Sequence, residues 1–324
     1  MFHRRLWLQT LCFAALTMNG AQAQTQFPVK PIKIIVPFGA GGVADLTARA
    51  VAQKLSESLG QPVLIDNRPG AGGIVAAELV TQAEPDGYTL LLMSNGTAVS
   101  ASLFKNLPFN PRSDFAPVSL LGMFDLAVVV PESSPHKNLS DLIEFGRAHP
   151  GKLNIGTINV GSTQHLAAEL LRSQGNLLAQ VIPYNGTPAV LNGLRGGQID
   201  AAVEILGPLK PQISAKTVRL LGVMGESRPK DMPQVPTVRE MPGLSQFNVS
   251  SWNALAAPAK TPKFIVDRLN LELGKVLSQP ELVQRMASFN VQAKSSTPAQ
   301  LSQLLDSDIK RWREVIQKAG ITPQ

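Results

Sequence analysis

The sequence predicts an α/β protein of two lobes, each built on a mostly parallel sheet flanked by helices. Short strand-like runs alternate with helically spaced apolar residues, and this order occurs twice along the 324 residues. A helix between successive strands makes a right-handed crossover, and such crossovers build parallel sheets. Two long apolar runs outside these units are interpreted as strands that cross between the lobes.

The two repeated units share the order β-loop-α-β-loop-α-β. Runs of Ile, Val and Leu mark the strands, whereas apolar residues three and four positions apart mark the helices. In the first unit we expect strands at 32–36, 63–65 and 89–93 and helices at 43–59 and 74–83. In the second unit we expect strands at 153–157, 180–182 and 199–203 and helices at 162–173 and 187–195.

The crossing strands are expected at residues 115–131 and 247–258. A chain that crosses twice returns to its first lobe, so the C-terminal helices belong there, and the last one carries an apolar stripe that needs a packing partner. These helices are expected at 261–277, 281–288 and 298–319. We therefore expect residues 24–124 and 247–324 to form domain 1 and residues 125–246 to form domain 2.

The N-terminal segment is typical of a secretory signal peptide. Arg4 and Arg5 precede an apolar run over residues 6–18, and Ala21-Gln22-Ala23 supplies a small-x-small cleavage pattern. The run is shorter than the roughly 20 residues that a membrane-spanning helix needs. We expect removal of residues 1–23, cleavage after Ala23 and a periplasmic location. The general secretory route is favoured, and the twin-arginine route stays open.

Composition disfavours several classes of function. The only cysteine, Cys12, lies in the predicted signal peptide, so the mature chain has no thiol for catalysis or metal binding, and Leu11 before it disfavours a lipid anchor. Without Arg4 and Arg5 the formal net charge falls from +7 to +5, and the remaining basic residues are scattered, so no nucleic-acid interface is expected. Zincin, P-loop and dinucleotide-binding motifs are absent, so we expect no metal and no cofactor.

Three loops with little side-chain bulk lead from a predicted strand into a predicted helix. They are residues 37–42, 158–163 and 183–187. In open parallel sheets, ligands bind at such loops, where backbone N–H groups and the positive end of the helix dipole favour an anion. None of the three contains Lys or Arg, so we expect neutral dipoles to hold the anion. For each loop the structural alternative is a tight turn.

Eight short segments, spread over essentially the whole mature chain, occur in the order found in one known receptor family. They are Lys30–Phe38, Gly41-Gly42 with Asp45, Gly60–Val63, Asn67–Gly73, Pro85–Leu90, Asp114–Val118, Gly161–Ala167 and Pro233–Thr237. As an ordered set they resemble the Bug family, the solute receptors of tripartite tricarboxylate transporters. The chain departs from that pattern at Gly39-Ala40, where the family has prolines, and at Glu204, where the family has Asp.

The resemblance implies a periplasmic-binding-protein-like clamp that closes on a small carboxylate, such as an organic acid or amino acid. It also implies delivery of that ligand to the membrane permease of a tripartite tricarboxylate transporter. The alternative is an extracytoplasmic sensor that presents its loaded form to a signalling receptor, because both functions need the same clamp. We expect a monomer, and the identity of the ligand stays open.

The residues expected to contact the ligand combine the loop positions with polar residues at strand ends. They are Phe38, Ala40, Gly41, Gly42, Asp45, Ser94, Thr97, Gly161, Ser162, Thr163, His165, Tyr184, Thr187 and Glu204. Some have structural alternatives: helix capping for Asp45, Ser162 and Thr163, core packing for Tyr184, and an ordinary polar turn for residues 94–97.

Ser162 and His165 also raise the hypothesis of a hydrolase. The two residues are one helical turn apart, no G-x-S-x-G elbow surrounds the serine, and no acidic residue is placed to orient the histidine. We therefore expect a binding protein and no enzyme.

Overall fold

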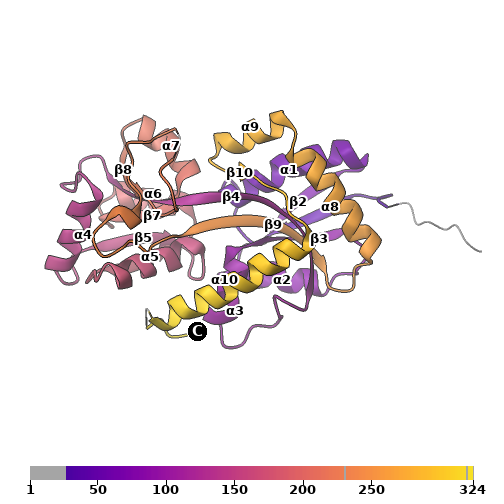
Figure 1. Ribbon diagram of the computed structural model, residues 1–324, viewed down its shortest axis with the longest axis horizontal. Helices are drawn as coiled ribbons and strands as arrows, with labels where there is room; N and C mark the ends of the chain where they lie inside the picture. Colours follow the sequence, from indigo (N-terminus) through magenta and orange to yellow (C-terminus); the bar gives the residue numbers. More distant parts are fainter. Residues whose placement is uncertain (1–26, 230, 319, 324) are drawn as a thin grey trace, which may run out of the picture.

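The computed structural model describes residues 27–229, 231–318 and 320–323 and shows two lobes joined by two long strands (Figure 1). The first lobe combines the beginning of the chain with its C-terminal helices, and the second is formed by the middle of the chain. This is the two-lobe α/β fold that the sequence predicts. The predicted signal peptide and its cleavage point after Ala23 lie outside the described residues.

The first lobe is built on three parallel strands in the order β2-β1-β3. They are β1 (Ile32–Val36), β2 (Val63–Asn67) and β3 (Thr89–Ser94). Helices α1 (Val43–Leu59) and α2 (Ile74–Thr81), with the 3-10 turn η1 (Ala71–Gly73), connect them, and α3 (Asn95–Leu103) follows β3. Gly60 ends α1 in the left-handed region, as its sequence signal predicts.

The two crossing strands are confirmed. Strand β4 (Phe115–Pro131) has the predicted bounds, and β9 (Ser250–Pro258) runs antiparallel to it, from the pair Phe115–Pro258 to the pair Asp125–Ser250. Strand β3 pairs with β9 in the first lobe, whereas β7 and β8 pair with β4 in the second. Strand β4 therefore belongs to the sheets of both lobes.

The second lobe has the parallel order β6-β5-β7, and β7 lies beside β4. Its strands are β5 (Asn154–Ile158), β6 (Gln180–Tyr184), β7 (Ala201–Ile205) and β8 (Val218–Val223). Its helices are α4 (Leu139–Ala148), α5 (Thr163–Gln174), α6 (Thr187–Arg195), α7 (Leu206–Ser214) and the 3-10 turn η2 (Val238–Glu240). The predicted bounds of α6 are reproduced.

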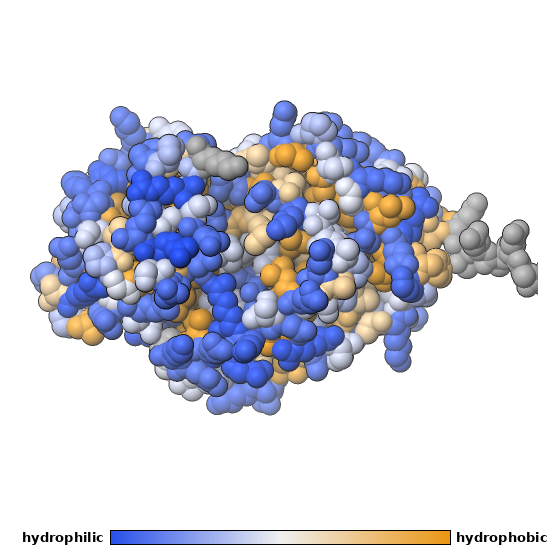
Figure 2. Space-filling view, in the orientation of Figure 1, coloured by the Kyte–Doolittle hydropathy of each residue, from blue (hydrophilic) through white to orange (hydrophobic). Residues whose placement is uncertain are grey.

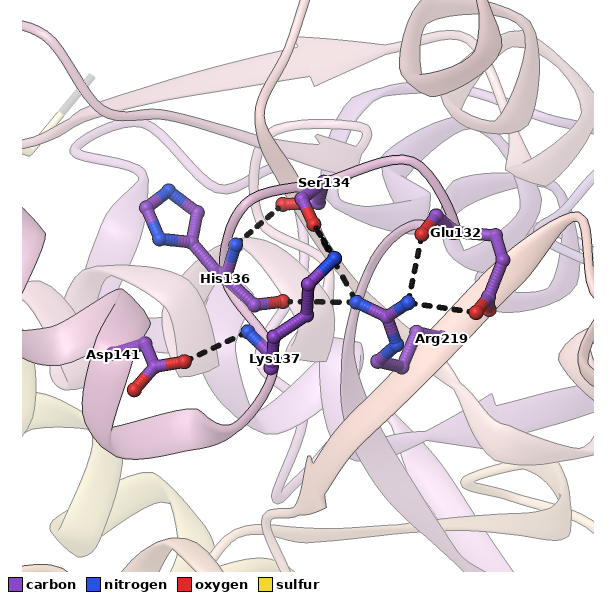
Figure 3. A network of polar contacts seen from close by, with 6 residues as sticks. All are labelled: Glu132, Ser134, His136, Lys137, Asp141 and Arg219. Carbon is purple, nitrogen blue, oxygen red and sulfur yellow. Dashed lines mark hydrogen bonds and ion pairs between the residues drawn. The ribbon is translucent and has the colours of Figure 1, made fainter.

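A polar network in the second lobe fixes the loop between β4 and α4 (Figure 3). The guanidinium of Arg219, on β8, donates to the carbonyl and the carboxylate of Glu132, each at 2.7 Å, and to the carbonyl of His136 at 3.3 Å. The Lys137 ammonium donates to the Ser134 carbonyl at 2.7 Å. His136 thus lies in a structural loop.

The C-terminal segment returns to the first lobe as α8 (Lys263–Leu277), α9 (Pro280–Ser288), the short strand β10 (Gln292–Ala293) and α10 (Pro298–Lys318). Helix α10 runs beside α3 and below the crossing strands (Figure 1), and its apolar stripe is buried there. Trp312 Nε1 donates to Asn95 Oδ1 at 2.5 Å, and Trp252 Nε1, on β9, donates to Asp308 Oδ2 at 2.7 Å. None of the helices in the described residues is long and apolar enough to span a membrane.

The interpretation of residues 94–97 as a polar turn is wrong, because these residues begin helix α3. Ser94 is its N-cap: the Ser94 hydroxyl accepts from the Gly96 amide at 3.1 Å, and the Thr97 hydroxyl accepts from the Ser94 amide at 3.3 Å. The segment Asn-Gly-Thr has weak intrinsic helix propensity, but most of α3 is buried against its neighbours. Tertiary packing therefore overrides local preference here.

Candidate ligand-binding cleft

A cavity of about 650 Å³ lies between the two lobes, and the outline of the molecule is indented between them (Figure 2). Both lobes contribute to its wall. The first lobe supplies the β1–α1 loop, the η1 segment and the start of α3, whereas the second supplies the starts of α5, α6 and α7. Ser251 and Asn253 of β9 also line the cavity. The three glycine loops predicted from the sequence thus meet at one cavity.

The first loop leaves the start of α1 accessible. Gly41 has φ +84, a conformation that favours glycine, and Gly42 is the N-cap of α1 with no side-chain cap. Space around Gly39 and Gly41 is open, because a Cβ at either position would meet no heavy atom within 4 Å. First-turn N–H groups have no partner inside a helix, so this helix start can receive an anion.

Asp45 does not line the cavity. Its carboxylate accepts hydrogen bonds from the Gly41 amide, the Asn67 side chain and the Arg49 guanidinium, each at 3.0 Å. Burial alone raises the pKa of Asp45, but these hydrogen bonds and the Arg49 charge together hold the pKa below its ordinary value. Asp45 thus fixes the β1–α1 loop from behind. It lies three residues past the N-cap Gly42 and accepts from the amide that precedes it, so the structural alternative, a role at the start of α1, agrees with the structure.

The second loop leads into α5 and reaches across to the first lobe. Ser162 is the N-cap of α5: its Oγ accepts from the His165 amide at 3.1 Å, which confirms the capping alternative, and it also lines the cavity. Thr163 Oγ1 lies 3.1 Å from Ser251 Oγ on β9. A Cβ at Gly161 would lie 3.4 Å from the Gly72 Cα of the first lobe. The lobes are thus in contact at this loop.

The third loop leads into α6, one face of which lines the cavity along its whole length. Gly186 is the N-cap, has φ +90 and provides no side-chain cap. Thr187, Leu191 and Arg195 recur at helical spacing along the wall. Arg195 is the only charged side chain among the described residues that line the cavity. The wall is otherwise made of neutral polar and apolar groups.

Glu204 is fully buried behind the wall. Its Oε2 accepts from the Ile205 amide at 3.0 Å and from Gln164 Nε2 at 3.4 Å. Burial raises the pKa of Glu204 to about 7, against the lowering effect of the Ile205 amide, the Gln164 amide and the Thr187 hydroxyl. The prediction that Glu204 ends a buried strand agrees with this position, whereas the expected placement in the cleft does not, because the carboxylate is not part of the lining.

His165 and Tyr184 also lie outside the lining. His165 is buried, which lowers the pKa of its imidazole. The Ser162 hydroxyl donates to the Ile158 carbonyl at 3.2 Å, so the hydrogen bonds of this serine go to the main chain and not to the histidine ring. Tyr184 packs against α6, where a Cβ at Gly193 would lie 2.7 Å from the tyrosine oxygen.

The structure brings ten of the fourteen predicted residues to the cavity wall. These are Phe38, Ala40, Gly41, Gly42, Ser94, Thr97, Gly161, Ser162, Thr163 and Thr187. The four outside it are Asp45, His165, Tyr184 and Glu204. Sequence reasoning missed Ser251 and Asn253, although polar residues two apart in an apolar strand share one face and were a usable signal. No group of three or more His, Cys, Asp or Glu side chains suited to a metal ion occurs in the described ranges.

Two lobes that enclose one cavity at their junction define the class of protein: a solute-binding protein of the clamp type. Residues 47–321 match the family model described as "Tripartite tricarboxylate transporter family receptor". The chain belongs to this family, and the resemblance predicted from the sequence is confirmed.

Relatives and solved structures cover nearly the whole chain. BugT of Bordetella pertussis is 33% identical over 296 residues, which is 91% of this chain and 90% of BugT. The solved structure of MatC from Rhodopseudomonas palustris with bound malate is 32% identical, with a TM-score of 0.83, and the match covers 90% of this chain and 100% of MatC. A second R. palustris structure, with adipate, is 30% identical, with a TM-score of 0.87 and coverage of 92% and 100%.

Proposed function

We propose that this protein captures a small carboxylate between its lobes, leaves it chemically unchanged and delivers it to the permease of a tripartite tricarboxylate transporter. The observation that carries this proposal is the convergence of three helix starts on one cavity: α1 from the first lobe, and α5 and α6 from the second. Glycine N-caps on α1 and α6 leave backbone N–H groups for an anion to accept.

The chemistry of the wall supports reversible capture. Apart from Arg195, the described residues of the lining carry no charged side chain, so backbone and neutral side-chain dipoles hold the carboxylate. The related MatC holds malate and the R. palustris relative holds adipate, which makes these two dicarboxylates the first probes for the present chain. Closure brings contacts from both lobes onto the ligand, and the ligand's higher affinity for the closed state drives the motion.

The same proposal places the mature protein in the periplasm. Export removes residues 1–23, so the chain begins at Gln24, which N-terminal sequencing of the exported protein checks. We assign residues 24–124 and 247–324 to one domain and residues 125–246 to the other, with the boundaries on the crossing strands and in the chain that leads into β9.

Equilibrium calorimetry on the mature protein tests ligand capture. The panel contains malate, adipate, amino acids and aromatic acids, and thermal denaturation is measured with the same compounds. We expect saturable binding of at least one carboxylate, with a rise in melting temperature because the ligand binds only the folded state. A folded protein that binds none of them contradicts the proposal.

Gly42→Asp tests where the carboxylate binds. Gly42 has φ −81 and ψ 169, which an L-residue adopts without strain, and Asp is a favoured N-cap. The new carboxylate occupies the start of α1, so we expect an unchanged or higher melting temperature and a loss of malate or adipate affinity of tenfold or more. Gly42→Asn, which matches the shape without the charge, is the control and should lose less. Wild-type affinity in Gly42→Asp would place the ligand elsewhere.

Uptake of the bound carboxylate in a deletion strain tests delivery to a permease. The wild-type gene should restore uptake, and the Gly42→Asp gene should not. If the protein binds its ligand but its deletion leaves uptake unchanged, the sensor alternative is favoured.

A further inference from the structure

Glu204 is a buried carboxylate that contacts the cavity only through its neighbours. Its Oε2 is held by the Ile205 amide and by the side-chain amide of Gln164, and both of these residues line the cavity. Its Oε1 has no hydrogen-bond partner in the described part of the chain. Residues that line the cavity thus separate this carboxylate from the cavity by a single layer.

Among the residues that the structure describes, no cationic side chain forms an ion pair or hydrogen bond with Glu204. The strands and helices packed around β7 are β4, β5, α5, α6 and α7. Their titratable and charged side chains are Asp125 on β4, His165, Glu169 and Arg172 on α5, Arg195 on α6 and Lys210 on α7, and Glu132 directly follows β4. Four of them are engaged in ion pairs with other residues: Arg172 with Glu169, Glu132 with Arg219, and Lys210 with Asp231. Arg195 donates to Asn192 Oδ1 at 2.6 Å.

Burial without a counter-charge favours the neutral form of a carboxyl group. This effect raises the pKa of Glu204 to about 7, so both protonation states are populated near neutral pH. A proton on Oε1 leaves Oε2 free to keep accepting from Ile205 and Gln164, so neither hydrogen bond has to break when Glu204 is protonated. Protonation therefore changes the charge behind the wall without removing the bonds that hold the carboxyl group.

We propose that Glu204 is a positioning residue whose protonation couples capture of an anionic ligand to uptake of one proton from solvent. The inference rests on the proposed function. An anion at the starts of α5 and α6 lies next to Gln164 and Thr187, and the like charge in a low-dielectric interior disfavours ionised Glu204. At the same pH, a larger fraction of the ligand-bound protein than of the ligand-free protein then carries a proton on Glu204.

The sign of the pH dependence follows from linkage. Because the bound state retains the proton to a higher pH than the free state, affinity is greatest below about pH 7 and falls as the pH rises above it. Each unit by which the bound ligand raises the pKa of Glu204 makes the ligand affinity at low pH about tenfold higher than the affinity at high pH. The His165 imidazole does not share this window, since burial lowers its pKa.

The test is calorimetric titration with malate, or adipate if malate does not bind, between about pH 6.5 and about pH 9, where both are ionised. Repeating it in buffers of different ionisation enthalpy counts the protons taken up. We expect the wild type to bind several-fold more tightly at the lower pH, with proton uptake near pH 7.5. We expect Glu204→Gln, a neutral substitute, to keep the low-pH affinity at every pH and to take up no proton. The control Glu169→Gln removes a carboxylate of α5 that pairs with Arg172 and should titrate like the wild type.

The outcomes separate the two proposals. A pH-independent affinity in the wild type, or an unchanged pH profile in Glu204→Gln, overturns this inference and leaves ligand capture standing. Binding that tightens as the pH rises also overturns it, because that sign means that binding releases a proton and does not take one up. If no carboxylate binds at any pH, the proposed function fails, and this inference fails with it.

Discussion

Gly161 of the second lobe lies against Gly72 of the first, so closely that a Cβ on Gly161 would be 3.4 Å from the Gly72 Cα and 3.3 Å from the Leu103 side chain. Gly161 also has φ +82 and precedes the N-cap of α5. A second close approach joins Gly207 at the start of α7 to the backbone of Phe289 after α9. The approach of the lobes thus depends on residues without side chains.

Gly161→Ala is expected to weaken ligand binding, because the added methyl group lies where the lobes meet. A closed state destabilised by about 1.4 kcal/mol relative to the open one lowers affinity roughly tenfold. Calorimetric titration with malate or adipate measures the effect.

Gly151→Ala is the matched control. Gly151 has φ +69 but no heavy atom within 4 Å of a Cβ, so it shares the backbone strain and not the position between the lobes. Both variants should lose about 1 kcal/mol of unfolding free energy, as expected for a non-glycine residue in the left-handed region. An equal loss of affinity in both variants would show that closure does not depend on Gly161.

Glu204→Gln should also change how stability depends on pH. Burial raises the pKa of folded Glu204 to about 7, above its ordinary value of 4.5, so the wild type holds a proton that the unfolded chain loses. The free energy of unfolding of the wild type therefore falls as the pH rises from 4.5 to about 7. Over the same pH range, the stability of Glu204→Gln relative to wild type increases by up to about 3 kcal/mol. Urea denaturation of ligand-free protein at several pH values checks this. A constant difference between the two proteins across the window would mean that Glu204 titrates normally.

Much of the fold could be predicted from sequence because periodicity reports burial directly. The 17-residue apolar run of β4 and the amphipathic spacing of α6 have the bounds that the sequence indicates. Helix α3 could not be predicted this way, since Asn95, Gly96 and Thr97 are weak helix formers whose helix is stabilised by burial against α10 and η1. Its Trp312–Asn95 hydrogen bond joins residues 217 apart in sequence.

The candidate site was partly predictable for a similar reason. Glycine loops before helices can be recognised locally, and they do line the cavity. The direction of a single carboxylate cannot be recognised locally. Asp45, on α1, turns toward Arg49 and Asn67, and Asn67 comes from a different element, strand β2. Gln164 and Ile205 line the cavity in place of Glu204 and hold its carboxylate behind them. Gln164 comes from α5, so this arrangement exists only in the folded lobe.

A crystal structure of the mature protein with bound malate or adipate tests the central claim most directly. We predict a ligand carboxylate within hydrogen-bond distance of backbone N–H groups at the starts of α1 and α5, so that both lobes hold one acid group. A carboxylate held by Arg195 alone, with the Gly39–Gly42 and Gly161–Thr163 loops making no contact with it, would contradict the account.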